Sequence, residues 1–271
     1  MTDGTRVAVL IDCDNISHRW AGAILAEVAR HGTLGIKRGY GDWASDHLKN
    51  WRPDLATYAI QPVQQFAYTV GKNSTDFALV IDAMDLLYSG AVDAFCIVSS
   101  DGDFTRLAMR LRESGKRVYG IGARKTPKSF QNACDQFTYV ELLVQDAETA
   151  DDEEQPAKKA ASAKSAAKKV TKKASPQTAA ATAVAAKGAL STLLLAAVEA
   201  NAKDDGWAAL GGVGSYIQNT NPTFDSRDYG YTKLSALVAD LPALEVKEVP
   251  TGNGLTALYV RERPKPSRRR S

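Results

Sequence analysis

The sequence of 271 residues contains no stretch of 18 apolar residues and only three cysteines. Its first residues, MTDGTR, lack the apolar core of a secretory signal peptide, so the sequence predicts neither export nor a membrane span. Cys13, Cys96 and Cys134 are far apart, and no CxxC or HxxxH spacing accompanies them, which argues against a disulfide framework and against a zinc site. We therefore expect a cytoplasmic protein without a membrane partner.

Patterns typical of nucleotide loops and of nucleophilic hydrolases are also missing. No G-x-G-x-x-G or Walker sequence is present, and Gly39-Tyr-Gly41 is too short a signal to replace one. The histidines, His18, His31 and His47, share no ligand spacing, and no Ser-His-Asp set is evident. If the protein is an enzyme, its chemistry has to come from other side chains.

Charge is distributed unevenly along the chain, although the net charge is only +3. Residues 1–150 carry sixteen basic and eighteen acidic side chains, and residues 188–260 carry four and eight. Residues 155–187 contain eight lysines and no acid, and residues 261–271 contain six basic side chains and one acid. Positive charge in such segments favours a polyanion as partner, because each cation that meets a phosphate adds to affinity.

The composition changes abruptly near residue 146. From Asp146 to about Gly188 the chain is rich in Ala and Lys and contains no aromatic residue, so it buries too little apolar surface to offset its ordering entropy. We therefore predict a first domain over residues 1–145, a disordered basic linker over 146–188, a second domain over 189–263 and a basic tail over 264–271.

Short apolar runs alternate with helical patterns in the first domain, which predicts an α/β fold with a mostly parallel sheet covered by helices. The predicted strands are Val7–Ile11, Leu34–Tyr40, Thr57–Val63, Ala94–Ser99, Arg117–Ile121 and Tyr139–Leu143. Helices are expected at residues 20–30, 44–50, 75–89, 103–114 and 127–136.

The second domain reads as three helices followed by a β-hairpin. Helices are predicted at residues 190–200, 207–218 and 226–240, and the turn Thr251-Gly-Asn-Gly254 separates two strand patterns, Leu244–Val249 and Leu255–Val260. This order is that of a small winged-helix α+β domain.

Acidic side chains directly follow two of the apolar strands. Val7–Ile11 leads into Asp12-Cys-Asp-Asn15, and Ala94–Val98 leads into Ser99-Ser-Asp-Gly-Asp103. The carboxyl ends of neighbouring parallel strands form the ligand crevice of an open α/β sheet. Carboxylates gathered there repel one another, and Mg²⁺ or Mn²⁺ among them would relieve that repulsion.

A further acid, Asp76, stands near the predicted start of a helix, where the helix dipole favours a negative charge. Asp82 lies six residues later and therefore on a different face, so we choose Asp76 as the candidate ligand. Each acid also has a simpler interpretation, since Asp12, Asp14, Asp101 and Asp103 could each cap a following helix. Lys72 is close enough in sequence to meet a substrate phosphate, although it could be an ordinary loop lysine.

Three motifs in the first domain resemble the NYN branch of the PIN-like nucleases, near the LabA-like group: Val9–Asn15, Lys72–Asp82 and Ile97–Phe104. The resemblance covers residues 6–143 and implies a Rossmann-like sheet and metal-dependent cleavage of RNA. It places metal-binding, catalytic acids at Asp12, Asp76, Asp101 and Asp103. Asn15 lines the site in this comparison, and we expect Lys72 and Ser100 beside it as substrate contacts.

Residues 190–261 resemble an OST-HTH (LOTUS) domain, a small winged-helix RNA-binding module. The residues that carry the resemblance are Phe224–Leu237, followed by the predicted hairpin. Within this motif we expect Arg227, Tyr229, Tyr231 and Lys233 to contact RNA, although the tyrosines could instead pack within the domain.

These observations predict a ribonuclease that uses Mg²⁺ or Mn²⁺ and recruits RNA through its C-terminal module and basic linker. The alternative is a non-catalytic RNA-binding regulator that keeps the nuclease fold as a scaffold.

Overall fold

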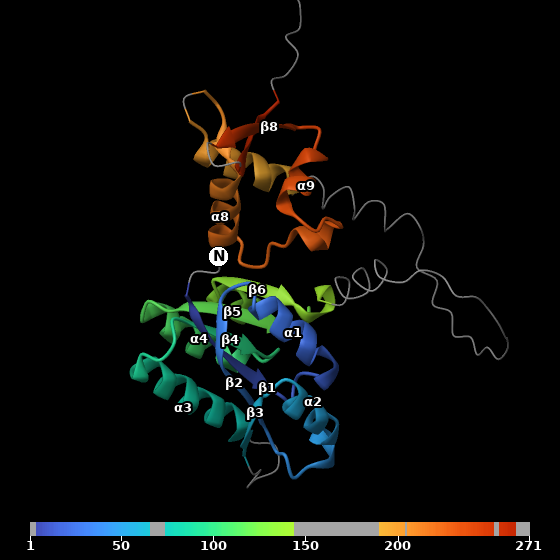
Figure 1. Ribbon diagram of the computed structural model, residues 1–271. Coiled ribbons are helices and arrows are strands. Elements are labelled where there is room, and N and C mark those ends of the chain that lie inside the picture. Colours follow the sequence, from blue (N-terminus) through green and yellow to red (C-terminus); the bar gives the residue numbers. More distant parts are fainter. Residues whose placement is uncertain (1–3, 66–73, 144–189, 204, 252–254, 264–271) are drawn as a thin grey trace, which may run out of the picture. The chain divides into compact units, whose positions relative to one another are not determined.

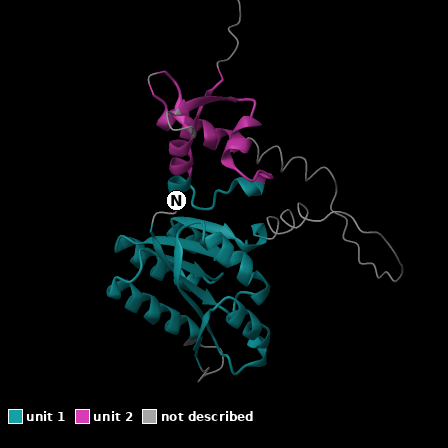
Figure 2. Cartoon of the chain, viewed as in Figure 1, with its two compact units in different colours: residues 1–150, 218–228 teal, residues 151–217, 229–271 magenta. Residues whose placement is uncertain are grey.

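The computed structural model describes residues 4–65, 74–143, 190–203, 205–251 and 255–263. The chain divides into two compact units (Figure 2), which are described separately below: unit 1 comprises residues 1–150 together with 218–228, and unit 2 comprises residues 151–217 and 229–271. The predicted linker and the predicted basic tail lie outside the described residues.

Unit 1 contains a six-stranded parallel sheet with the order β3-β2-β1-β4-β5-β6. Its strands are β1 (Arg6–Asp12), β2 (Thr33–Gly41), β3 (Gln61–Gln64), β4 (Ala94–Val98), β5 (Arg117–Gly122) and β6 (Gln136–Tyr139). The two central strands, β1 and β4, are buried apolar runs because both faces of the sheet are covered there. The predicted α/β fold with a parallel sheet is confirmed.

Helices cover both faces of this sheet (Figure 1). Side chains alternate along β1, so Val7, Val9 and Ile11 join one core and Ala8 and Leu10 join the other. The first core packs against α1 (Ala21–Val28), the 3₁₀ helix η2 (Asp46–Trp51) and α2 (Arg52–Thr57). The second packs against α3 (Ser74–Ser89), α4 (Thr105–Glu113) and α5 (Lys128–Ala133).

The two central strands of the sheet, β1 and β4, are parallel neighbours and end at the same carboxyl-terminal edge. Strand pairing brings Ile11 beside Val98, so the segments that follow both strands leave the sheet side by side. Beyond β1 the sheet continues with β2 and β3, and beyond β4 it continues in the opposite direction with β5 and β6. This reversal is the position at which open α/β sheets bind ligands.

Two predicted strands of unit 1 have different limits in the structure. The strand expected at Thr57–Val63 is only β3, because α2 extends to Thr57 and Ala59 adopts a left-handed conformation (φ 50°) before the chain extends. The strand expected at Tyr139–Leu143 ends at Tyr139. Residues Val140–Leu142 form the 3₁₀ helix η4. The strand, β6, comes before it, and its residues Phe137 and Tyr139, two positions apart, pack into the same core.

Unit 2 contains a helix at residues 190–201, α8 (Leu210–Thr220, whose last residues belong to unit 1), α9 (Leu234–Ala239) and the sheet β7-β9-β8. The predicted hairpin is present as the antiparallel pair β8 (Leu244–Thr251) and β9 (Leu255–Glu262), and β7 (Ala208–Ala209) adds a short edge strand. The single helix expected at 226–240 is interrupted: η5 (Ser226–Tyr229) ends before Gly230, whose φ of 85° is incompatible with a right-handed helix.

Helices in the described ranges are all too short or too polar to span a bilayer.

Candidate metal centre

Three of the four predicted acids converge at the carboxyl edge of the sheet. Asp76, Asp101 and Asp103 each offer a carboxylate oxygen, and these oxygens lie within 4.8 Å of one another. Asp76 comes from the first turn of α3, Asp101 is the N-cap of the 3₁₀ helix η3 (Gly102–Phe104) that follows β4, and Asp103 lies within η3. We refer to these three residues together with Asp12 as the acid cluster.

Asp12, the last residue of β1, is only 1% exposed, and its charge acts on Asp76. Its Oδ2 accepts hydrogen bonds from Asn15 Nδ2 and Ser99 Oγ, both at 2.7 Å. Its Oδ1 is buried and has no hydrogen-bond partner among the described residues. Burial raises the pKa of this carboxyl, and the bonds from Ser99 and Asn15 oppose that rise. A buried oxygen without a donor is the kind of ligand that a cation satisfies.

The carboxyl of Asp76 has a pKa raised to about 6. Partial burial is the largest cause, and the negative charges of Asp12, Asp101 and Asp103 add to it. Such repulsion is expected where several carboxylates share a site without a positive charge between them, and a divalent cation would reverse it.

Asp101 has a local structural role as well. As the N-cap of η3 it accepts a hydrogen bond from the backbone N–H of Asp103 at 2.9 Å, and its own N–H donates to Ser99 Oγ at 3.1 Å. Capping and membership of the cluster are therefore compatible, because capping uses Asp101 Oδ1 and the carboxylate has a second oxygen.

The loop after β4 fits closely against β5. A Cβ added to Gly122 would lie 2.4 Å from the carbonyl oxygen of Ser99, so only glycine permits this approach. Ser100 Oγ accepts a hydrogen bond from Ala123 N at 2.9 Å, which fixes Ser100 to the end of β5. Ser99, which sequence reasoning did not select, bridges Asp12 and Asp101, and the signal that could have identified it is its position directly after a buried strand.

The remaining predicted residues of the first domain have separate surroundings. Asn15 holds Asp12, as described, and Lys72 lies outside the described residues. Asp82, which was not chosen from the sequence, pairs with Arg38 and accepts a hydrogen bond from Tyr40 away from the cluster. Asp14 accepts a hydrogen bond from Thr75 Oγ1 at 3.0 Å, so it links the end of β1 to the start of α3.

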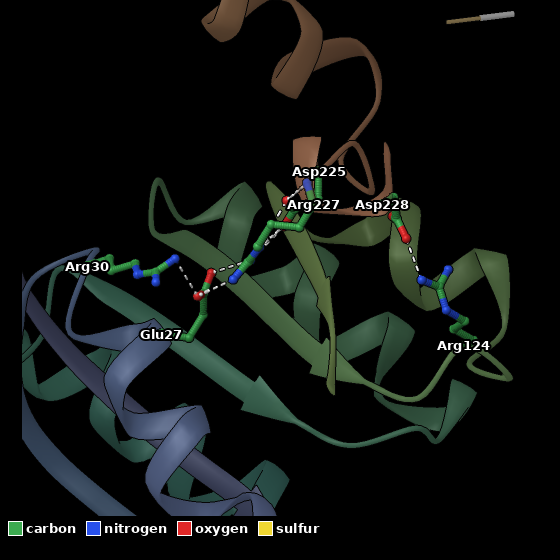
Figure 3. Close-up of polar contacts among 6 residues, drawn as sticks. All are labelled: Glu27, Arg30, Arg124, Asp225, Arg227 and Asp228. Atoms are coloured by element: carbon green, nitrogen blue, oxygen red, sulfur yellow. Dashed lines mark hydrogen bonds and ion pairs between the residues drawn. The ribbon is translucent and has the colours of Figure 1, made fainter. Parts of the chain in front are cut away.

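Arg227 forms an ion-pair network in unit 1 (Figure 3). Its Nη1 and Nη2 each lie 3.0 Å from an oxygen of Glu27 on α1, and its Nη2 lies 2.6 Å from Asp225 Oδ2. The side chains of Arg227 and Glu27 are 8% and 5% exposed. Arg30 adds a second cation to Glu27 at 3.1 Å. In this arrangement the guanidinium that we expected to contact RNA is directed to carboxylates.

The other residues expected to contact RNA lie in unit 2. The Tyr231 hydroxyl donates a hydrogen bond to Asp240, which raises the pKa of the phenol, whereas Lys233 is exposed at the start of α9. Tyr229 is the last residue of η5 and is partly buried. Their roles toward RNA stay predictions.

Two family models match the chain. Residues 6–142 match the NYN domain, and residues 185–256 match the OST-HTH/LOTUS domain. The first match contains every residue of the acid cluster, and the second contains Arg227, Tyr229, Tyr231 and Lys233. Both matches agree with the resemblances inferred from the motifs.

Three individual proteins are similar to parts of the chain. An uncharacterized protein of Methanocaldococcus jannaschii is 28% identical over 125 residues, which are 44% of this chain and 48% of that protein, so the chain spans about half of its length. An uncharacterized Nitrosomonas europaea protein solved by NMR is 32% identical, with 43% of this chain and all of that chain covered and a TM-score of 0.27. A Chromobacterium violaceum NMR structure is 36% identical over 30% of this chain and 86% of that chain, with a TM-score of 0.25.

Proposed function

We propose that this protein, which belongs to the NYN-domain family, is a ribonuclease that hydrolyses RNA phosphodiester bonds with the help of Mg²⁺ or Mn²⁺. The observation that carries the proposal is the acid cluster at the switch point of the sheet, with three carboxylate oxygens within 4.8 Å and a buried Asp12 oxygen that has no donor among the described residues. Hard oxygen ligands of this type suit Mg²⁺ and Mn²⁺.

The donor set fits such a cation. Asp76, Asp101 and Asp103 would hold it together with the buried Oδ1 of Asp12. When bound, a divalent cation supplies Lewis-acid stabilisation of the charge that develops on phosphate oxygens and makes water a stronger acid. Ser99 and Asn15 keep Asp12 oriented through their hydrogen bonds, so the carboxylate needs little rearrangement when a substrate arrives.

Other described groups near the cluster are poorly suited to act as nucleophiles. The Ser99 hydroxyl already donates to Asp12, and Ser100 Oγ is held against Ala123. The Cys13 thiol is buried, and burial together with the adjacent acids raises its pKa, so it stays protonated. These surroundings support direct attack by water rather than a covalent enzyme intermediate.

Recruitment of RNA is the second part of the proposal. The eight lysines of residues 155–187 and the six basic residues of 261–271 supply net positive charge, whereas residues 1–150 and 188–260 each carry a net negative charge. Lys233 is exposed and adds a cation within the OST-HTH/LOTUS match. Arg227 is engaged by Glu27 and Asp225, so we assign most of the affinity to these other cations.

The test is a cleavage assay of the full chain on labelled single-stranded RNA with Mn²⁺, Mg²⁺ or EDTA. Asp101→Asn should lower the rate by more than about a hundredfold, since even residues that only support metal ligands change activity by about 10–100-fold. Asparagine is also a good N-cap, so the variant should fold. The matched control is Asp85→Asn, which removes an exposed acid from α3 outside the cluster and should leave the rate within about twofold.

Two outcomes would contradict the proposal. Cleavage that persists in Asp101→Asn would mean that the acid cluster is not the active site, and cleavage that persists in EDTA would mean that the reaction does not need a divalent cation. RNA binding without cleavage under any metal condition would favour the regulator that keeps a nuclease scaffold.

A further inference from the structure

A cavity of about 610 Å³ opens in unit 1 beside the carboxyl end of β1. It is formed by the loop after β1 and by η2, and the residues used below are Asp14, Asn15, Arg19, His47, Asn50 and Trp51. Its volume lies within the range of about 300–1,000 Å³ that small-molecule sites occupy. The proposed function does not use this cavity.

The wall of the cavity offers hydrogen-bond donors that have no protein partner. Arg19, His47 and Asn50 are exposed, and no side-chain hydrogen bond or ion pair joins any of them to another residue in the described part of the chain. Arginine and asparagine present forked donors that suit phosphate oxygens and the polar edges of bases. Asp14 is the only acid in the lining and Arg19 offsets its charge, so the cavity lacks the concentrated negative charge of the acid cluster.

The floor of the cavity is rigidly held by contacts within unit 1. Trp51 is 2% exposed, and its indole N–H donates to the carbonyl oxygen of Ile16 at 3.1 Å. His18 Nδ1 lies 2.9 Å from Asp54 Oδ2, which fixes the imidazole that lines the adjoining wall. A site whose shape is maintained by such contacts loses little conformational entropy when a ligand enters.

Two residues connect the cavity directly to the acid cluster. Asn15 lines the cavity and donates to Asp12 Oδ2 at 2.7 Å. Asp14 lines it and accepts from Thr75, the residue that precedes Asp76, at 3.0 Å. The cavity and the acid cluster are therefore adjacent and are separated by Asp14 and Asn15. Successive nucleotides of one RNA strand could occupy the two sites.

We propose that this cavity binds the nucleotide adjacent to the phosphate that lies at the acid cluster. Arg19 holds the phosphate of that nucleotide, and Asn50 and His47 contact its sugar and base. The inference rests on the proposed function, because it takes RNA as the substrate, but it concerns recognition rather than cleavage. It makes Arg19 and Asn50 substrate-binding residues of the first domain.

The experiment is a titration of the full chain with uridine 5′-monophosphate in EDTA, in which binding is measured by calorimetry or ligand-observed NMR. Arg19→Ala should weaken binding about tenfold, the usual effect of losing a charge-assisted hydrogen bond, and Asn50→Ala should weaken it less. Lys49→Ala is the matched control, because Lys49 is an exposed cation of η2 that does not line the cavity, and it should change affinity less than twofold.

Two further ligands distinguish a site for an RNA strand from a site for free nucleotides or free phosphate. A uridine tetranucleotide should compete with the mononucleotide and show the same loss in Arg19→Ala, whereas inorganic phosphate should bind at least about tenfold more weakly. The proposal fails if the mononucleotide does not bind, if Arg19→Ala and Lys49→Ala behave alike, or if the tetranucleotide does not compete, which would indicate a site for free nucleotides. None of these measurements needs cleavage, so they stand even if the protein proves inactive as a nuclease.

Discussion

Glu27 and Asp12 are two buried carboxylates of unit 1 that differ in the charge of the groups bound to them. Glu27 receives two hydrogen bonds of 3.0 Å from Arg227 and a third contact from Arg30, so its charge is matched within the protein. Asp12 receives only neutral donors, Asn15 and Ser99, and keeps one oxygen without a partner among the described residues.

The difference separates a structural carboxylate from one that is available to a ligand. A buried acid beside a fixed guanidinium contributes to stability only as long as the pair is complete. A buried acid that has neutral donors and neighbouring acids is held in place but not neutralised, and a cation from solution can complete it.

Removal of Arg227 should give the largest loss of stability. Arg227→Met leaves Glu27 buried without its principal cation, a change that typically costs about 3–5 kcal/mol of unfolding free energy. Urea unfolding of the full chain can be followed by tryptophan fluorescence, because three of the four tryptophans, Trp20, Trp43 and Trp51, belong to unit 1.

Arg124→Met is the control for this prediction. Arg124 pairs with Asp228, but its side chain is 53% exposed, so the loss should stay below about 1 kcal/mol. Combining Glu27→Leu with Arg227→Met should recover much of the stability, since a buried ion pair can be replaced by apolar groups. Equal midpoints for Arg227→Met and the wild type would mean that the Glu27–Arg227 pair contributes nothing to folding.

Added Mn²⁺ should stabilise the wild type through the acid cluster. A ligand that binds only the folded state at a hundred times its Kd adds about 2.7 kcal/mol, which is visible as a higher Tm. Asp12→Asn should reduce this increase, and the metal-free variant should be slightly more stable than the wild type because one buried negative charge is gone. Glu27→Gln should show the reverse: lower stability without metal and an unchanged response to Mn²⁺. An identical Mn²⁺ response in Asp12→Asn would remove Asp12 from the site.

Sequence reasoning predicted the acid cluster because its signals are local. Asp12 ends the apolar strand β1 and Asp101 comes three residues after the end of β4, and a parallel sheet brings such strand ends to one edge. The helical start at Asp76 was also readable, since the acid follows Ser74 and Thr75 and precedes a long helical pattern. These residues lie together because β1 and β4 are parallel neighbours, an arrangement that the alternation of strands and helices in the sequence favours.

The Glu27–Arg227 pair could not be predicted in this way. The two residues are 200 positions apart, and neither periodicity nor spacing connects them. Arg227 lies in a motif that resembles an RNA-binding module, so a solvent-exposed role was the natural expectation. The predicted limits of two elements were wrong for a different reason. Ala59 adopts a φ of 50°, which its residue type does not indicate, and Gly230, with a φ of 85°, interrupts a helix that hydrophobic periodicity had carried through it.

The smallest expected effect is the pH dependence of the metal-free protein. The pKa of Asp76 is about 6 in the folded state, above the ordinary aspartate value of 3.8, so the folded state binds more protons between these values. Stability in EDTA should therefore rise as pH falls from 7 toward 5. Because Asp76 is partly exposed, we expect less than about 1 kcal/mol from it. Asp76→Asn should flatten this part of the Tm profile.

Asp93 provides the opposite case for the same measurement. Hydrogen bonds from Arg6 lower its pKa to about 2, so its contribution is present above pH 4 and is lost as pH falls toward 2. Asp93→Asn should therefore leave the rise between pH 7 and pH 5 intact and remove part of the decline below pH 4. If Asp76→Asn and the wild type show the same Tm profile between pH 7 and pH 5, the repulsion within the acid cluster is too weak to favour a bound cation, and the contrast with Glu27 disappears.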